Sequence, residues 1–213
     1  MKAKDPRIRQ AQIKRFAPGE AAAPPDYEPG DFILTHSSGL FGRLIRFGES
    51  LRYWGKDAKY ARWNHAALIT STEGELIEAL SVGVVRSPIS RYTPTEYYLI
   101  HLHEDDADSR DRRQAVAYAT YCLGEGYSWL TICNIALALL TGCKFTFGID
   151  GQVICSGLVA RCLERTSIIF DGAASNISPA DLAKQFRVEP PSAKESVGAP
   201  PPDPPDVPAR VVS

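Results

Sequence analysis

The sequence predicts an α+β fold in which a small antiparallel sheet packs against helices. Two observations support this class. Strand candidates and helix candidates are segregated along the chain, because one strand and one helix precede a run of short strands that is followed by helices alone. In addition, the chain shows neither the alternation of strands and helices that builds a parallel α/β sheet nor an internal repeat.

The strand candidates are short apolar or alternating runs bounded by turn residues. The first, residues 31–35, follows the turn signal Pro29-Gly30. Four further runs alternate in side-chain character or are rich in β-branched and aromatic residues. They are residues 64–70, 75–80, 82–88 and 96–103. Because these four runs are consecutive, we expect them to form a meander.

The helix candidates repeat apolar residues every three or four positions. They are residues 39–50, 109–123, 129–141, 155–165 and 179–186. Asp108 is the expected N-cap of the second helix, since its carboxylate can accept from the first unpaired backbone N–H groups. The last helix begins with Ser178 and Pro179 and carries Asp181 in its first turn, which predicts a capping box with proline at the helix start.

Length and composition are those of one ordinary domain with two tails. The chain has 213 residues, of which 44% are hydrophobic, and this is enough for one core. Residues 1–26 read as a basic, weakly ordered N-terminal segment, and half of the 16 prolines fall within residues 190–208. We therefore expect a folded domain over residues 27–188 and a Pro-rich disordered tail over residues 189–213.

Charge and hydropathy exclude several classes of partner. The net charge of −1 gives no overall attraction for nucleic acid or for an anionic membrane. The most apolar run, residues 129–142, is too short to span a bilayer comfortably, so we expect no transmembrane span, although peripheral membrane contact stays open. The N-terminus is charged where a secretory signal needs an apolar stretch, which predicts a cytoplasmic location and leaves only non-classical export as the alternative.

The cysteine pattern indicates reduced thiols. The five cysteines stand at positions 122, 133, 143, 155 and 162, without a CxxC pair, and so form neither a disulfide framework nor a zinc site. No Gly-rich phosphate loop and no HExxH motif is present, and we expect no metal and no cofactor. Reduced cysteines of this kind are candidates for thiol chemistry.

Cys155 is the candidate nucleophile. It follows a loop with two glycines and stands in the first turn of the helix predicted over residues 155–165. A helix N-terminus favours the thiolate form through its unpaired N–H groups and the helix dipole. The alternative is a small buried hydrophobe, because Cys155, Leu158, Val159 and Cys162 share one apolar helix face.

A cysteine nucleophile needs a base, and His65 with Glu78 is the best pair for that role. If the turn at residues 71–74 pairs Thr70 with Glu75, paired positions sum to 145. Glu78 then faces Ala67 and is the diagonal neighbour of His65 on one sheet face. A carboxylate on an apolar face is costly without a partner, which favours a real pairing over a core histidine and a solvated glutamate.

The other histidines have weaker cases. His36 has no visible polar partner in the sequence. His101 and His103 share a strand face beside the acidic run at residues 104–106, where a metal site is conceivable and a solvated strand end is the favoured interpretation.

Five segments in a fixed order resemble a known family. They are PGDFILTHSS, WNHAALI, ELIEALSVGVV, GEGYSWL and VICSGLVARCLE. Together they resemble the circularly permuted NlpC-type papain-like cysteine amidases and peptidases, the YiiX/YebB-like group, over about residues 28–187. In that group the histidine strand precedes the cysteine helix, as it does here. The chain lacks the Asn-Cys-Glu-His block of the related lecithin:retinol acyltransferase-like branch.

The resemblance implies a permuted papain-like catalytic domain over residues 27–188, with a five-stranded, barrel-like sheet packed on the cysteine helix. It also implies Cys155 as nucleophile, His65 as general base and Glu78 as the third member of the triad. Tyr127 resembles a tyrosine that lines the site, and with Trp129 and Ser156 it completes the expected substrate-binding set.

The expected function is a thiol hydrolase that cleaves an amide bond through a thioester intermediate. The expected substrate is a small-molecule, peptide or lipid-derived amide, so peptide, isopeptide and N-acyl amide bonds all remain. One alternative keeps the triad and moves acyl groups on lipids, with apolar residues around Trp129–Leu140 and residues 40–47 as the acyl pocket. The other is a non-catalytic binding module.

Overall fold

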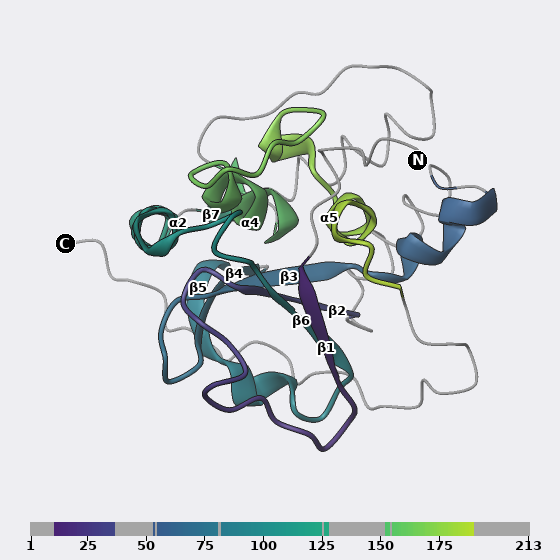
Figure 1. The fold of residues 1–213 in the computed structure, drawn as a ribbon, viewed down its shortest axis with the longest axis horizontal. Coiled ribbons are helices and arrows are strands. Elements are labelled where there is room, and N and C mark those ends of the chain that lie inside the picture. The colour runs from purple at the N-terminus through teal and green to yellow at the C-terminus, as the bar shows by residue number, and fades with distance from the viewer. Residues whose placement is uncertain are drawn as a thin grey trace.

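A computed structural model describes residues 11–36, 53, 55–80, 82–124, 126–127, 152–153 and 155–189. Within these residues, helices cover one face of a six-stranded antiparallel sheet (Figure 1). This confirms the predicted α+β class with an antiparallel sheet. Among the described residues, no helix is long and apolar enough to cross a membrane.

The sheet is open and has one strand more than the resemblance implied. Its strands are β1 (Gln12–Phe16), β2 (Phe32–Thr35), β3 (His65–Ile69), β4 (Glu75–Leu80), β5 (Gly83–Pro88) and β6 (Tyr97–His101). Their order is β1-β6-β2-β3-β4-β5, and every neighbouring pair is antiparallel. The expectation of a five-stranded, barrel-like sheet is therefore wrong, because β1 and β5 form two separate edges.

The predicted four-strand meander is only partly right. β3, β4 and β5 are consecutive antiparallel neighbours, but β6 lies between β1 and β2. The short 3-10 helix η2 (Ile89–Tyr92) follows β5 and separates it from β6 in the chain. The position of β6 depends on long-range pairing with β2, and the spacing of strands along the chain does not encode such a partner.

Strand β1 contradicts the prediction of weak order for residues 12–16, which belong to the sheet. Residues 12–16 pair with β6, and Phe16 is buried with its ring stacked on Tyr97 at a centroid distance of 5.0 Å. Lys14 and Arg15 made the segment look like a solvated tail. Charged side chains, lysine above all, are common on edge strands because they discourage pairing with other molecules.

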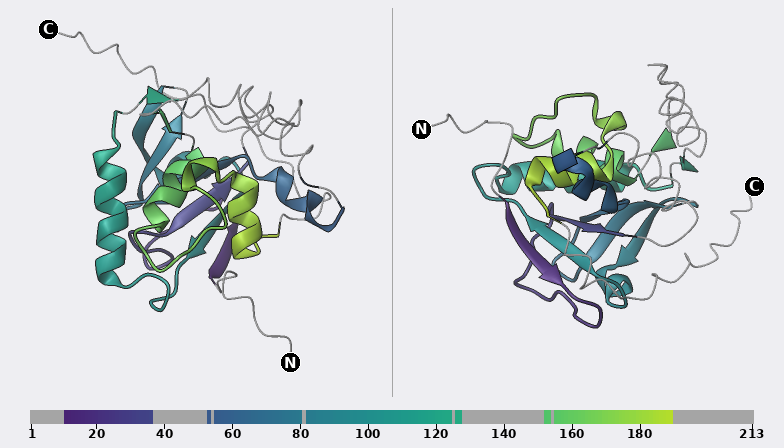
Figure 2. Two further views of the ribbon diagram at one scale, coloured as in Figure 1. Left: turned by 90° about the horizontal axis from the view of Figure 1, so that it is seen from above. Right: turned by 90° about the vertical axis from the view of Figure 1, so that its right-hand side faces the viewer.

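The helices form one layer above the sheet. They are α2 (Ser109–Tyr121), α4 (Cys155–Leu163) and α5 (Pro179–Phe186), with 3-10 helices η1 (Gly55–Arg62) and η3 (Ala174–Asn176). Helix α4 contacts β3 and β4 and lies between α2 and α5 (Figures 1 and 2). The predicted helices over residues 39–50 and 129–141 lie outside the described residues.

The two predicted helix starts are confirmed. The Asp108 carboxylate accepts hydrogen bonds from the backbone N–H groups of Arg110 and Asp111. Ser178 and Asp181 form the reciprocal capping box at the start of α5. Caps of this kind fix where a helix begins, because they satisfy N–H groups that have no partner inside the helix.

Both faces of the sheet are buried. Side chains such as Ala66 and Leu68 point into a core under the helices. Ala67 and Ile69, which alternate with them on β3, point into a second core on the opposite face. This second core is closed by Phe16, Ala22, Tyr27, Ile89 and Tyr92. By the alternation of side chains along a strand, His65 and Glu78 belong to this second face.

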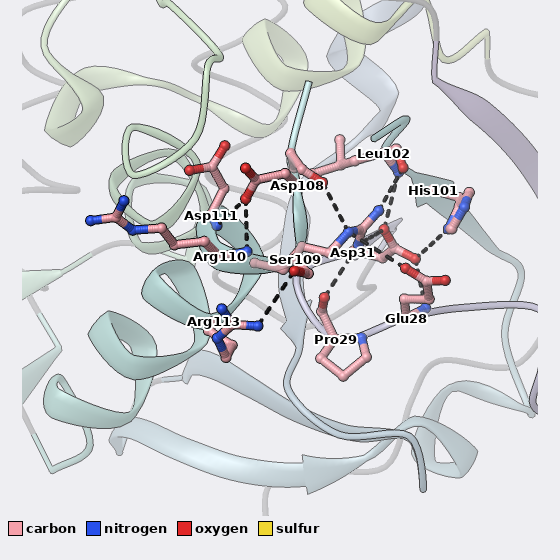
Figure 3. A network of polar contacts seen from close by, with 12 residues as sticks. Glu28, Pro29, Asp31, His101, Leu102, Asp108, Ser109, Arg110, Asp111 and Arg113 are labelled. Atoms are coloured by element: carbon pink, nitrogen blue, oxygen red, sulfur yellow. Dashed lines mark hydrogen bonds and ion pairs between the residues drawn. The ribbon is translucent and has the colours of Figure 1, made fainter. Parts of the chain in front are cut away.

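A buried network of charges fixes one end of the sheet, as Figure 3 shows. Asp31, just before β2, accepts from Arg112 of α2 at 2.8 Å, from His101 at 2.7 Å and from the backbone N–H groups of Leu102 and Glu28. The Arg112 guanidinium also donates to the carbonyl oxygens of Pro29, Leu102 and Ala107. We call Asp31, His101 and Arg112 the Asp31 network; it ties β2, β6 and α2 together.

Candidate active site

The predicted register between β3 and β4 is confirmed, and the two strands part where the candidate site begins. Leu68 pairs with Ile77 and Ile69 with Leu76, so paired positions sum to 145. The pairing stops at Leu68, although β4 remains paired with β5 as far as Leu80. Residues 65–67 of β3 thus have no paired residue on β4, although His65 and Ala66 remain paired with β2 on the other side.

Cys155 lies against this end of β3. It is the first residue of α4, it is 2% exposed, and its Sγ lies 4.0 Å from the carbonyl oxygen of Asn64. The backbone N–H groups of Ala66 and Ser156 both act on the sulfur and favour its charged form. The structure therefore brings the thiol of the cysteine helix against the start of the histidine strand, which is about ninety residues earlier in the chain.

His65 and Glu78 are joined as the strand register predicts. His65 Nε2 lies 2.6 Å from Glu78 Oε2, and both side chains are buried. With Nε2 occupied by the carboxylate, Nδ1 is the ring nitrogen left for the thiol. The carboxylate thus fixes the orientation of the imidazole, which is the role of the third group in a nucleophile and base arrangement.

Tyr92 is a site residue that the sequence analysis missed. Its hydroxyl donates to Glu78 Oε2, the same oxygen that contacts His65. Its ring also stacks on the His65 imidazole, with centroids 6.1 Å apart and planes 22° apart. Tyr92 ends the short helix η2 and belongs to no periodic run, so the sequence offered no pattern that would place it beside His65.

The charges of the thiol and the imidazole support each other. Burial alone would raise the pKa of Cys155, but His65 and the N–H groups of Ala66 and Ser156 outweigh it and hold that pKa below its ordinary value. Burial alone would lower the pKa of His65, but the Cys155 thiolate and the Glu78 carboxylate outweigh it and raise that pKa to about 10. Each of the two groups thus favours the charged form of the other.

Glu78 stays charged in spite of complete burial. Burial would raise its pKa, yet the hydrogen bond and the charge of His65 lower that pKa below the ordinary value. Cys162 is the contrast on the same helix, because burial raises its thiol pKa and the charge of Arg165 only partly opposes that effect. Of the two cysteines described in α4, Cys155 alone has a lowered thiol pKa.

The predicted substrate-binding residues have different outcomes. Ser156 is fully buried and its hydroxyl donates to the carbonyl oxygen of Ile177 at 2.7 Å, so its side chain anchors α4 rather than facing a ligand. Tyr127 lies in β7 (Gly126–Tyr127), whose backbone runs parallel to β8 (Gln152–Val153) with Tyr127 beside Val153, two residues before the nucleophile. Trp129 lies outside the described residues.

The remaining histidines take up other contacts. His101 bonds Asp31, so the strand end considered for a metal holds part of a structural network instead. His36 Nε2 lies 3.8 Å from Glu96 Oε2, a partner that the sequence did not reveal. Within the described part of the chain, no group of three or more His, Cys, Asp and Glu side chains is arranged to hold a metal ion.

Comparison with protein-family models found no match, and comparison with curated protein sequences found none either. The arrangement of Cys155, His65 and Glu78 therefore has to be interpreted from its own geometry.

Proposed function

We propose that this protein is a thiol hydrolase that cleaves an amide bond through Cys155, His65 and Glu78. One arrangement carries the proposal: a thiol at a helix N-terminus lies against the start of the histidine strand, and the Nε2 atom of that histidine is held by a buried carboxylate. A buried carboxylate without partners is costly, and Glu78 is stabilised in the core by its hydrogen bonds with His65 and Tyr92 and by the charge of His65. A purely structural thiol would not need this arrangement.

The chemistry follows from the roles of the three groups. The Cys155 thiolate attacks the amide carbonyl carbon, and the oxygen that becomes negative is held by the backbone N–H at the start of α4. The C–N bond then breaks as His65 gives its proton to the leaving nitrogen, which leaves an acyl group on sulfur as a thioester. His65 next takes a proton from water, the hydroxide attacks the thioester, and the thiolate returns. Glu78 keeps its charge and stabilises the imidazolium throughout.

We further propose that the fold is a permuted variant of the papain-like arrangement. The order of the histidine strand before the cysteine helix supports this, as does the packing of α4 on β3 and β4. The extra edge strand β1 is then an addition to a five-stranded sheet. The reaction assigned to Cys155 does not depend on this relationship.

The experiment that tests the function is acylation of the purified chain with p-nitrophenyl butyrate, an activated acyl donor. We expect about one equivalent of nitrophenolate in a fast phase, a single butyryl group on Cys155 by peptide mass mapping, and its removal by neutral hydroxylamine, which cleaves thioesters. Cys155→Ala should abolish the fast phase, whereas Cys162→Ala, the matched change on the same helix, should retain it.

The fate of the acyl group then separates the alternatives. Release of butyrate into water, and slower release from butyryl anilides, supports an amide hydrolase. Transfer to an added lysophospholipid or fatty amine, in preference to water, would instead assign the site to lipid acyl transfer. Failure of Cys155 to acylate at all, in folded protein, would contradict both catalytic assignments.

A further inference from the structure

We propose that Tyr92 is a positioning residue of the site, which holds the Glu78 carboxylate and the His65 imidazole in the one arrangement that directs the ring toward Cys155. The inference rests on the proposed function and adds to it a fourth residue. Its basis is that one tyrosine contacts both partners of the His65 and Glu78 pair, by hydrogen bond and by ring stacking.

One carboxylate oxygen of Glu78 is shared by two hydrogen-bond donors. Glu78 Oε2 accepts from both His65 Nε2 and the Tyr92 hydroxyl. Two donors at one oxygen restrict rotation of the carboxylate, since a turn that improves one hydrogen bond lengthens the other. A carboxylate that cannot rotate gives the imidazole a fixed partner, and the ring position is then fixed in turn.

The ring of Tyr92 limits the imidazole from a second direction. It stacks on His65 with planes 22° apart, and it is 2% exposed. The imidazole therefore cannot tip into the second core without displacing a buried aromatic ring. Packing and hydrogen bonding restrict different motions of His65, so Tyr92 acts on both its tilt and its rotation.

The backbone that carries Tyr92 is itself anchored. Its carbonyl oxygen accepts from the backbone N–H and the hydroxyl of Thr95, and Ile89 at the start of η2 donates to the carbonyl oxygen of Gly74. The short helix is thus attached to the β3 to β4 turn at one end and to the approach to β6 at the other. A side chain on an anchored backbone can hold its partners more precisely than one on a free loop.

The hydroxyl also keeps its proton at neutral pH. Burial and the neighbouring carboxylate raise the pKa of Tyr92 well above its ordinary value. The phenol therefore does not exchange protons with the triad, and its role is separate from acid and base catalysis.

Tyr97 provides a matched control. It lies in the same second core, with its ring 6.5 Å from Tyr92, and its buried hydroxyl also makes one hydrogen bond, accepting from the backbone N–H of Ala22. Tyr97→Phe therefore removes the same atom and one hydrogen bond from the same core without touching Glu78 or His65. Any effect of Tyr92→Phe beyond that of Tyr97→Phe belongs to the site.

The test is the pH profile of Cys155 alkylation by iodoacetamide in the full chain, followed by peptide mapping. A carboxylate with one donor fewer is protonated at higher pH, and the imidazolium then loses its counter-charge. The acid limb of the profile is the range in which the alkylation rate falls as the pH is lowered, and we expect Tyr92→Phe to move it to higher pH. We also expect Tyr92→Phe to slow turnover roughly tenfold, the effect of losing one hydrogen bond to a charged group. Tyr97→Phe should leave the limb in place.

Tyr92→Leu removes both the stack and the hydrogen bond and should shift the limb at least as far, which keeps the test available if one variant is unstable. An unshifted limb in folded Tyr92→Phe, or equal shifts in Tyr92→Phe and Tyr97→Phe, would overturn the positioning role. Because alkylation needs no substrate, this result is independent of hydrolysis. A wild-type protein whose Cys155 fails to acylate would instead count against the proposed function.

Discussion

In the described part of the chain, His65 and His101 are each hydrogen-bonded to a buried carboxylate, and the two pairs differ in where their other hydrogen bonds lead. In the Asp31 network both carboxylate oxygens accept two donors each, and two of the four donors are backbone N–H groups. In the His65 pair, the donors to Glu78 are side chains, two of which, His65 and Tyr92, meet at one oxygen, and the other side of the imidazole faces a thiol.

This difference separates a structural ion pair from a reactive one. The Asp31 carboxylate and the Arg112 guanidinium form hydrogen bonds with backbone groups of the residues that flank β2, β6 and α2. They therefore hold these three elements together. His65 bonds Glu78 through Nε2, which leaves Nδ1 for Cys155. A buried charge pair is therefore informative about function only once the destination of every hydrogen bond is known.

The largest expected difference lies between the two histidines. His65→Gln should lower turnover by a factor on the order of 10³ or more, because it removes the base and the partner of the thiolate. His101→Gln should leave turnover per folded molecule unchanged, since His101 only supplements the bonds of Asp31. Steady-state assays on both variants, normalised to the folded fraction by near-UV circular dichroism, measure this. Equal losses would remove the distinction between the two pairs.

The free energy of unfolding should depend more on the Asp31 network than on the residues of the candidate site. Arg112→Met leaves Asp31 buried with its main counter-charge gone, and breaking such a pair costs about 3 to 5 kcal/mol. Cys155→Ala removes one buried sulfur atom and should cost less, about 1 kcal/mol. Urea unfolding at neutral pH gives both free energies. A Cys155→Ala protein as unstable as Arg112→Met would mean that the thiol is chiefly a packing element.

Glu78→Gln should lower turnover less than His65→Ala or Cys155→Ala does. The amide oxygen can still accept from His65 and preserve the ring orientation, while the charge that stabilises the imidazolium is lost. We expect a loss of roughly 10-fold to 100-fold, by analogy with carboxylates that orient a metal-bound histidine. The kinetics of Glu78→Gln and His65→Ala, compared at verified folding, test this ranking. A loss as large as that of His65→Ala would show that the carboxylate does more than orient and stabilise.

The sequence was most informative about the site where local rules apply. The hairpin register from Thr70 to Glu75 placed Glu78 diagonally from His65, and the structure has that register. The caps at Asp108 and Ser178 followed from residue types alone. Each of these inferences involves residues close together in the chain, where spacing determines geometry.

Long-range contacts explain what the sequence did not reveal. The charged run at Lys14 and Arg15 concealed an edge strand in which Phe16 is the only buried residue. Asp31 and Arg112 are about eighty residues apart, and neither stands in a pattern that points to the other. Tyr92 was missed for the same reason, since its contact with Glu78 depends on how η2 returns to the sheet.

The most direct test of the central claim is the rate of alkylation of each cysteine in the native chain as a function of pH. The thiolate is the reactive form, so a lowered pKa means that Cys155 should remain the fastest thiol at neutral pH and lose reactivity only as the pH falls through that lowered value. Cys162, whose pKa is raised, should stay unreactive until the protein is unfolded. If Cys155 instead gained reactivity only as the pH rose through about 9, like an ordinary thiol, or reacted after Cys122 or Cys162, the pairing of Cys155 with His65 would be contradicted.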